Sequence, residues 1–183
     1  MRIGIYGGTF NPIHRGHLTA ARAAMDVLGL DRLLLIPASV PPHKVLPQGS
    51  AEPADRLEMA ALACAQLGPV AQALDTELRR TGLSYTVDTL RQLRMEHPED
   101  ELWLLMGTDM FLSLHTWHEP DVICHLAVIV GMHREEDKDG TMEQQKSLLE
   151  ERFGAKAVVL HNVPLEISST HQRRMLMLGA ADH

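Results

Sequence analysis

Short apolar runs alternate with segments of helical periodicity along most of the chain. Apolar runs with the length of buried strands lie at 3–6, 32–37, 70–78, 101–106, 126–132 and 156–161. Apolar residues at helical spacing predict helices over 15–28, 54–66, 86–96, 142–152 and 168–178. This alternation predicts an α/β fold: a single-domain, doubly wound, Rossmann-like parallel sheet with helices on both faces. Ligands of such sheets bind at the carboxyl ends of the strands.

The first predicted strand runs into Gly7-Gly8, and the next predicted helix starts near His14 and His17. Two glycines let backbone amides approach a ligand, and a helix start directs unpaired amides and a positive dipole toward it, so we predict an anion site. His14 and His17 are three residues apart and would lie on one helical face. The sequence lacks both the Gly-Lys-Ser/Thr ending of a Walker loop and the third glycine of the dinucleotide fingerprint. A tight turn with surface histidines is the alternative.

The whole segment 7–17, Gly-Gly-Thr-Phe-Asn-Pro-Ile-His-Arg-Gly-His, resembles the signature of the HxGH nucleotidyltransferase superfamily. Further segments resemble the bacterial nicotinate-nucleotide adenylyltransferases in the same order: Pro-Pro-His-Lys at 41–44, Gly-Leu-Ser-Tyr-Thr-Val-Asp-Thr-Leu at 82–90, Gly-Thr-Asp at 107–109 with Trp117, and Ile-Ser-Ser-Thr at 167–170 followed by Arg173. This resemblance implies transfer of AMP from ATP to nicotinate mononucleotide, giving nicotinate adenine dinucleotide and pyrophosphate without a protein nucleophile.

The resemblance also implies a role for individual residues. It assigns alignment and charge stabilisation in catalysis to His14, His17, Lys44 and Arg173. It assigns ATP binding to Gly7, Gly8, Thr9, Phe10, His17, Gly107, Asp109, Arg134, Ile167, Ser168, Ser169 and Arg173. It assigns mononucleotide binding to Asn11, Lys44, Tyr85, Thr86 and Trp117, with the Tyr85-Thr86 helix start receiving the nicotinate carboxylate.

Simpler interpretations exist for several of these residues. Asp109 alone would more often cap the following helix, and Trp117 alone would more often belong to the core. The chain departs from the family pattern after Arg134, at Gln172, and at its end, where relatives continue into a further helix. We therefore expect one nucleotidyltransferase domain over 1–183 that lacks the usual C-terminal helix.

Charge and composition narrow the range of partners. Asp and Glu outnumber Lys and Arg by 24 to 17, giving a formal net charge of −7, which disfavours non-specific nucleic-acid binding. Cys64 and Cys124 form no close pair, and no segment has the length of a membrane span or the pattern of a leader, so we expect a cytoplasmic protein without a membrane partner. The sequence leaves open whether the protein forms a homo-oligomer.

Magnesium is expected to arrive with ATP, because Mg²⁺ is held mainly by phosphate oxygens and water. No protein-bound structural metal is expected, since His115, His118 and His125 lack the partners of a zinc site. Two alternatives to the main hypothesis remain. One is another HxGH nucleotidyltransferase with a different phosphorylated acceptor, and the other is a non-catalytic nucleotide-binding sensor.

Overall fold

The fold is known from a computed structural model that describes residues 1–8, 10, 13, 15–38, 53–80, 85–133 and 140–161. In chain order its elements are β1 (Arg2–Gly8), α1 (Arg15–Leu28), β2 (Arg32–Pro37), α2 (Pro53–Leu67), β3 (Ala71–Ala73), α3 (Thr86–Glu96), β4 (Glu101–Gly107), α4 (Thr108–Ser113), the 3-10 turn η1 (Leu114–Thr116), α5 (Pro120–Leu126), β5 (Val128–Met132), α6 (Thr141–Phe153) and β6 (Ala157–Leu160). The predicted ranges of α1, β2 and α3 are confirmed to the residue.

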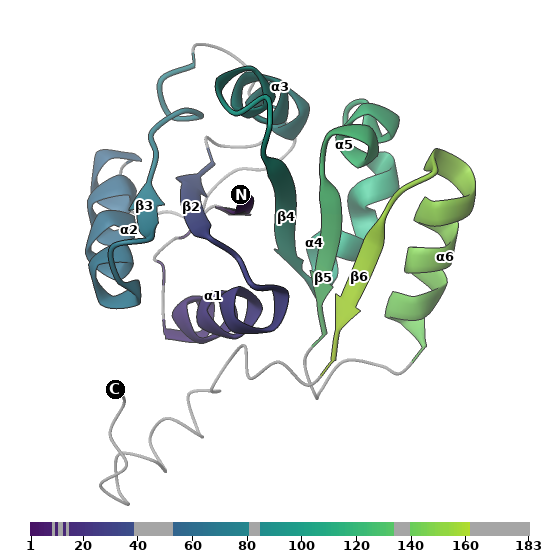
Figure 1. The fold of residues 1–183 in the computed structure, drawn as a ribbon, viewed down its shortest axis with the longest axis horizontal. Helices are drawn as coiled ribbons and strands as arrows, with labels where there is room; N and C mark the ends of the chain where they lie inside the picture. The colour runs from purple at the N-terminus through teal and green to yellow at the C-terminus, as the bar shows by residue number, and fades with distance from the viewer. Residues whose placement is uncertain are drawn as a thin grey trace, which may run out of the picture.

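All described strands join one parallel sheet in the order β3-β2-β1-β4-β5-β6 (Figure 1). The chain moves outward from β1 to β3 and then returns to place β4 on the other side of β1. This order is that of the doubly wound Rossmann fold, so the predicted fold class is confirmed. The direction of winding reverses between β1 and β4, and the carboxyl ends of these two strands therefore flank the crevice where such folds bind ligands.

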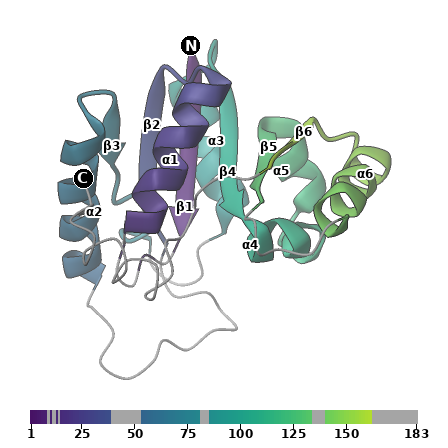
Figure 2. The ribbon, with the colours of Figure 1, turned by 90° about the horizontal axis from the view of Figure 1, so that it is seen from below.

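Apolar side chains on both faces of the sheet form the core. Helices α1 and α2 bury their apolar stripes on one face, whereas α3, α4, α5 and α6 pack against the other. Helix α2 lies beside the edge strand β3, and α6 lies beside β6 at the opposite end (Figure 2). Strands covered on both faces carry near-continuous apolar runs, which is why sequence alone locates them.

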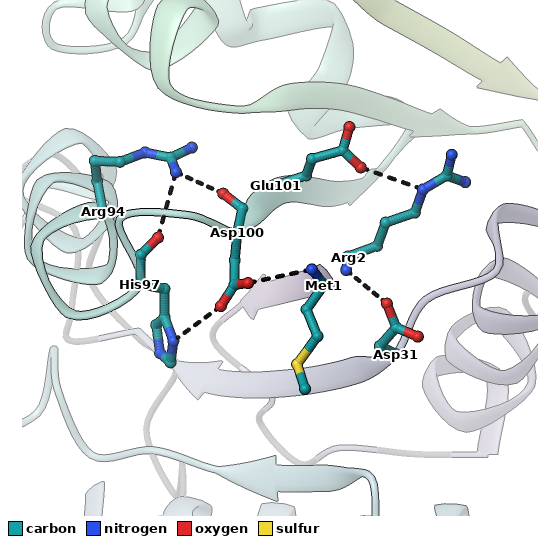
Figure 3. A network of polar contacts seen from close by, with 7 residues as sticks. All are labelled: Met1, Arg2, Asp31, Arg94, His97, Asp100 and Glu101. Atoms are coloured by element: carbon teal, nitrogen blue, oxygen red, sulfur yellow. Dashed lines mark hydrogen bonds and ion pairs between the residues drawn. The ribbon is translucent and has the colours of Figure 1, made fainter.

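A network of charged groups closes the amino end of the sheet (Figure 3). The Met1 amine lies 3.2 Å from Asp100 Oδ1, and Arg2 Nε lies 3.2 Å from Glu101 Oε2. The backbone N–H of Arg2 donates to Asp31 Oδ2 at 2.7 Å. These contacts join the first residues of β1 and β4 to the turn before β2, on the edge remote from the carboxyl ends.

The structure corrects two predictions of secondary structure. The strand predicted over 70–78 is wrong beyond β3, because the chain turns at 75–80 and buries Thr76 and Glu77 outside the ladder. The segment 107–126 holds α4, η1 and α5, which were not predicted, and Leu126 ends α5 instead of opening β5. Helices of six or seven residues contain too few periodic positions for a clear pattern. The predicted helix 168–178 lies outside the described residues.

Candidate active site

Glycines end both strands that flank the crevice. Gly7 and Gly8 end β1, and Gly107 ends β4. A Cβ on Gly8 would lie 3.2 Å from the Phe10 ring, and a Cβ on Gly107 would meet no described atom within 4 Å. All three glycines are partly exposed, and the described residues leave space for close approach of a ligand at Gly107, whereas the Phe10 ring lies against Gly8.

Phe10, which follows β1, and His17, in the first turn of α1, have their rings in contact. Phe10 adopts a left-handed backbone conformation with φ of 47° and is 4% exposed, two residues after the end of β1. The His17 ring meets the Phe10 ring edge-to-face, with centroids 5.2 Å apart, and lies 6.2 Å from the Tyr6 ring. The aromatic contacts hold this half-buried imidazole in the first turn of α1, beside the end of β1.

Asp109 lies in the first turn of α4, two residues after the end of β4. The capping alternative for Asp109 is wrong, because the N-cap is Gly107 and no side-chain hydrogen bond caps this helix. The Asp109 carboxylate is exposed at the carboxyl edge of the sheet. Thr108, in contrast, is buried, and its hydroxyl donates to Met132 O on β5 at 3.5 Å. One residue thus anchors the helix start while the next remains accessible.

The predicted nicotinate site brings α3 together with the segment after η1. Tyr85 is the N-cap of α3, and no side chain of the described residues caps this helix either. Its ring stacks on the His118 ring, with centroids 4.2 Å apart and planes 23° apart. Trp117 directly precedes His118, is half-buried against the core, and donates through Nε1 to Ser113 Oγ at 3.0 Å. Tyr85, Thr86 and Trp117 therefore belong to one region, although the core interpretation of Trp117 is correct for part of its ring.

A buried side-chain amide that the sequence did not reveal supports α4 and η1. Gln145 of α6 is 6% exposed, and its Nε2 lies 3.0 Å from both Phe111 O and His115 Nδ1. The side-chain amide donates to the carbonyl, and these contacts fix α4 and η1 against α6. Nothing in the sequence distinguishes Gln145 from its neighbour Gln144, because both are polar residues within a helical pattern.

A second missed feature is a buried carboxylate between β3 and α3. Glu77 is 9% exposed and accepts a hydrogen bond from the Thr89 hydroxyl at 2.9 Å. Burial raises the pKa of Glu77, while the hydrogen bond from Thr89 and the charge of Arg80 oppose that rise. Consecutive polar residues at Thr76 and Glu77, inside a segment otherwise typical of a strand, were the signal that could have revealed it.

Many predicted site residues lie outside the described part of the chain. They are Thr9, Asn11, His14, Lys44, Arg134, Ile167, Ser168, Ser169 and Arg173. The described residues include Gly7, Gly8, Phe10, His17, Tyr85, Thr86, Gly107, Asp109 and Trp117. No group of three or more His, Cys, Asp or Glu side chains in the described ranges could hold a metal ion. In the same ranges, no helix is both long and apolar enough to cross a membrane.

The fold and the glycine-lined switch point define a nucleotide-binding α/β protein, and comparison with known families specifies which one. Residues 5–175 match the cytidylyltransferase-like family. A protein of Gloeobacter violaceus named probable nicotinate-nucleotide adenylyltransferase is 42% identical and aligns over 98% of this chain and 86% of its own length. Its namesake from Geobacter metallireducens is 39% identical, over 98% of this chain and 88% of the relative. The chain belongs to the nicotinate-nucleotide adenylyltransferase family.

Solved structures show the same fold. Nicotinic acid mononucleotide adenylyltransferase of Plasmodium falciparum, solved in complex with NaAD, superposes with a TM-score of 0.71 at 18% identity. The match covers 96% of this chain and 83% of that one. At this identity the likeness supports the architecture alone.

Proposed function

We propose that the protein transfers the AMP half of ATP to nicotinate mononucleotide, forming nicotinate adenine dinucleotide and pyrophosphate in NAD biosynthesis. A phosphate oxygen of the mononucleotide forms a bond to the α-phosphorus of ATP, and the bond from that phosphorus to the bridging oxygen breaks. Pyrophosphate leaves with the electron pair. The observation that carries the proposal is the 39% and 42% identity, over 98% of this chain, to relatives of this name. The fold agrees with it, because β1 and β4 end in glycine and flank the switch point.

The triphosphate would lie over the carboxyl ends of β1 and β4. His17 would contact phosphate oxygens from the first turn of α1, and Gly7 and Gly8 would let backbone amides approach them. Gly107 and Asp109 would border the ribose, where a carboxylate accepts hydroxyl hydrogen bonds. His14, Lys44, Arg134 and Arg173, with the helix start predicted at Ser168 and Ser169, would complete the charge stabilisation.

The start of α3 would select the acceptor. Helix starts leave backbone amides without intrahelical partners, and in the described ranges no side chain caps the first turn of α3. Such amides, together with the helix dipole, suit the nicotinate carboxylate. Trp117 would provide a ring for stacking, since its indole is half-buried and it directly precedes His118, whose ring contacts Tyr85.

Magnesium would enter with ATP, held mainly by phosphate oxygens and water, and would neutralise charge on the leaving pyrophosphate. The enzyme would act in the cytoplasm, where both charged substrates are available.

Pyrophosphate release from purified protein and ATP tests this function. Three phosphorylated acceptors are supplied separately: nicotinate mononucleotide, pantetheine phosphate and glycerol phosphate. Release that depends on nicotinate mononucleotide is the expected result. Release with another acceptor would instead support a different nucleotidyltransferase, and ATP binding without release under any condition would support the sensor alternative.

A further inference from the structure

A buried hydrogen-bond network joins the turn at 75–80 to the first half of α3. The Thr89 hydroxyl donates to Glu77 Oε2 at 2.9 Å and accepts from Arg80 Nη1 at 2.7 Å. A second guanidinium nitrogen of Arg80 donates to Gln92 Oε1 at 3.3 Å. Thr89 is 2% exposed and Glu77 is 9% exposed, so the network operates largely away from water.

Thr89 also connects directly to the start of the helix. Its backbone N–H bonds to Tyr85 O at 3.4 Å, while its side chain bonds to the turn. The same residue therefore ties the N-cap of α3 to the segment that follows β3. Because Arg80 reaches one helical turn further, to Gln92, the network fixes both the axial position and the rotation of α3.

Among the described residues, two other side chains tie α3 to its surroundings. Arg94, in the last turn, donates part-buried hydrogen bonds to Asp100 O at 2.5 Å and to Leu126 O at 3.2 Å, so it fixes the end of the helix and not its start. Arg91 contacts both Glu119 oxygens at 3.0 Å, and both side chains are more than a third exposed. Exposed ion pairs contribute little, even where the geometry is good. Correct placement of the helix start must therefore rest on apolar packing and on the buried network, in which a broken partner leaves a polar group unsatisfied.

We propose that Thr89, held by Glu77 and Arg80, is a positioning residue for acceptor selection. The network sets where the uncapped amides at Tyr85 and Thr86 lie, and so how well they meet the nicotinate carboxylate. This inference rests on the proposed function, because it requires the start of α3 to receive the acceptor. Thr89 itself does not touch the substrate.

The decisive variant is Thr89→Val, which removes the hydroxyl but keeps a β-branched side chain. The KM for nicotinate mononucleotide should rise about tenfold, because small displacements of a positioning group are costly, while the KM for ATP should change less than about twofold. The kcat/KM for nicotinate mononucleotide, divided by that for nicotinamide mononucleotide, should also fall. Thr89→Ser restores a hydroxyl and should recover both quantities to within about threefold of the original protein.

A matched control removes a carboxylate from the same turn without touching the network. Asp75 pairs with Arg79 at 2.9 Å, and the two side chains are 43% and 68% exposed. Asp75→Asn should leave both Michaelis constants unchanged. All variants are compared at a temperature where circular dichroism shows each to be folded.

Several outcomes would overturn the inference. One is an unchanged mononucleotide KM in folded Thr89→Val, and another is an equal rise for both substrates. If Thr89→Val does not fold, Arg80→Lys replaces it, because one ammonium cannot reproduce the two-pronged contact of the half-exposed guanidinium. Arg80→Lys should show the same split between substrates, and an equal or absent effect would again refute the inference. Failure of the proposed function would be distinct: the unmodified protein would then release no pyrophosphate with nicotinate mononucleotide.

Discussion

The two edges of the sheet are built from opposite kinds of chemistry. At the amino edge, carboxylates pair with the cations nearest to them, as Arg2 does with Glu101 and the Met1 amine with Asp100 (Figure 3). At the carboxyl edge, β1 and β4 end in glycine, and no described side chain caps the starts of α3 and α4. Polar groups that are satisfied within the chain stabilise the fold, whereas uncapped amides stay available for a ligand. Variants at the two edges should therefore change different quantities.

The largest effect should follow from His17→Ala at the carboxyl edge. A phosphate-binding donor contributes more as charge shifts to pyrophosphate, so turnover should fall by about two to three orders of magnitude. The ring is half-buried, and its aromatic contacts with Phe10 and Tyr6 are also lost, so the melting temperature should be measured beside turnover. Near-normal turnover in the folded variant would remove His17 from the catalytic set.

The next effect concerns the choice between acid and amide acceptors. The carboxamide of nicotinamide mononucleotide carries no charge. Its NH2 group is a donor and would face the backbone N–H groups at the start of α3, which require an acceptor. This mismatch should cost about 1–3 kcal/mol, or roughly a tenfold to hundredfold preference for nicotinate mononucleotide. Steady-state kinetics with both mononucleotides measure the preference, and equal efficiencies would contradict the assigned role of the helix start while leaving adenylyl transfer intact.

Two glycines near the carboxyl ends of β4 and β5 test whether this edge binds a ligand. Gly107 and Met132 are register partners, and Gly131 precedes Met132. Gly107→Ala should raise the KM for ATP about tenfold with little change in melting temperature, because its Cβ meets no described atom but would enter the proposed ribose site.

Gly131→Ala is the matched structural change. Its Cβ would lie 2.8 Å from the Phe111 ring and 2.8 Å from Met142 Cε, both fully buried. Overpacking of this kind should cost about 1–3 kcal/mol of stability, measured by denaturant unfolding. If Gly107→Ala lost as much stability and left ATP binding unchanged, the open space at Gly107 would have no functional meaning.

Glu77 predicts a pH dependence of stability. Because its pKa is raised by burial in the folded protein, the folded state holds this proton more tightly than the unfolded chain does. The stabilisation is complete below the ordinary Glu pKa and is lost as pH rises through the raised folded pKa. The free energy of unfolding of the original protein should therefore fall relative to that of Glu77→Gln across this window, and parallel curves would contradict the prediction.

Sequence predicted the sheet better than the site, for physical reasons. Long apolar runs such as β2 and β4 report burial on two faces, which any parallel sheet imposes. The placement of Gly7 and Gly8 at the end of β1 and of His17 at the start of α1 was predictable, because a short apolar run, two glycines and a helical pattern follow one another within a few positions. The burial of Thr89 and Gln145 depends on hydrogen-bond partners 12 and 34 residues away, so no local sequence pattern could predict it.

Short helices escaped prediction for a different reason. The Glu119-Pro120 pair is typical of a helix start, because proline fits the first helical turn, and it could have revealed α5. Helix α4 gives no comparable signal, since its N-cap is a glycine that also ends a strand.

The smallest effect should come from the amino edge, where Glu101→Gln removes one partner of Arg2. The side chains of Arg2 and Glu101 are 48% and 59% exposed, so solvent already screens their attraction. Arg2 also keeps its backbone bond to Asp31 and its guanidinium bond to Leu28 O at 2.8 Å. Stability should fall by less than about 1 kcal/mol, and salt should narrow the difference further. Both Michaelis constants and turnover should stay unchanged, because the pair lies at the end of β4 opposite Gly107. A loss of turnover approaching that of His17→Ala would show that the two edges are coupled, and would break the division between a stabilising edge and a binding edge.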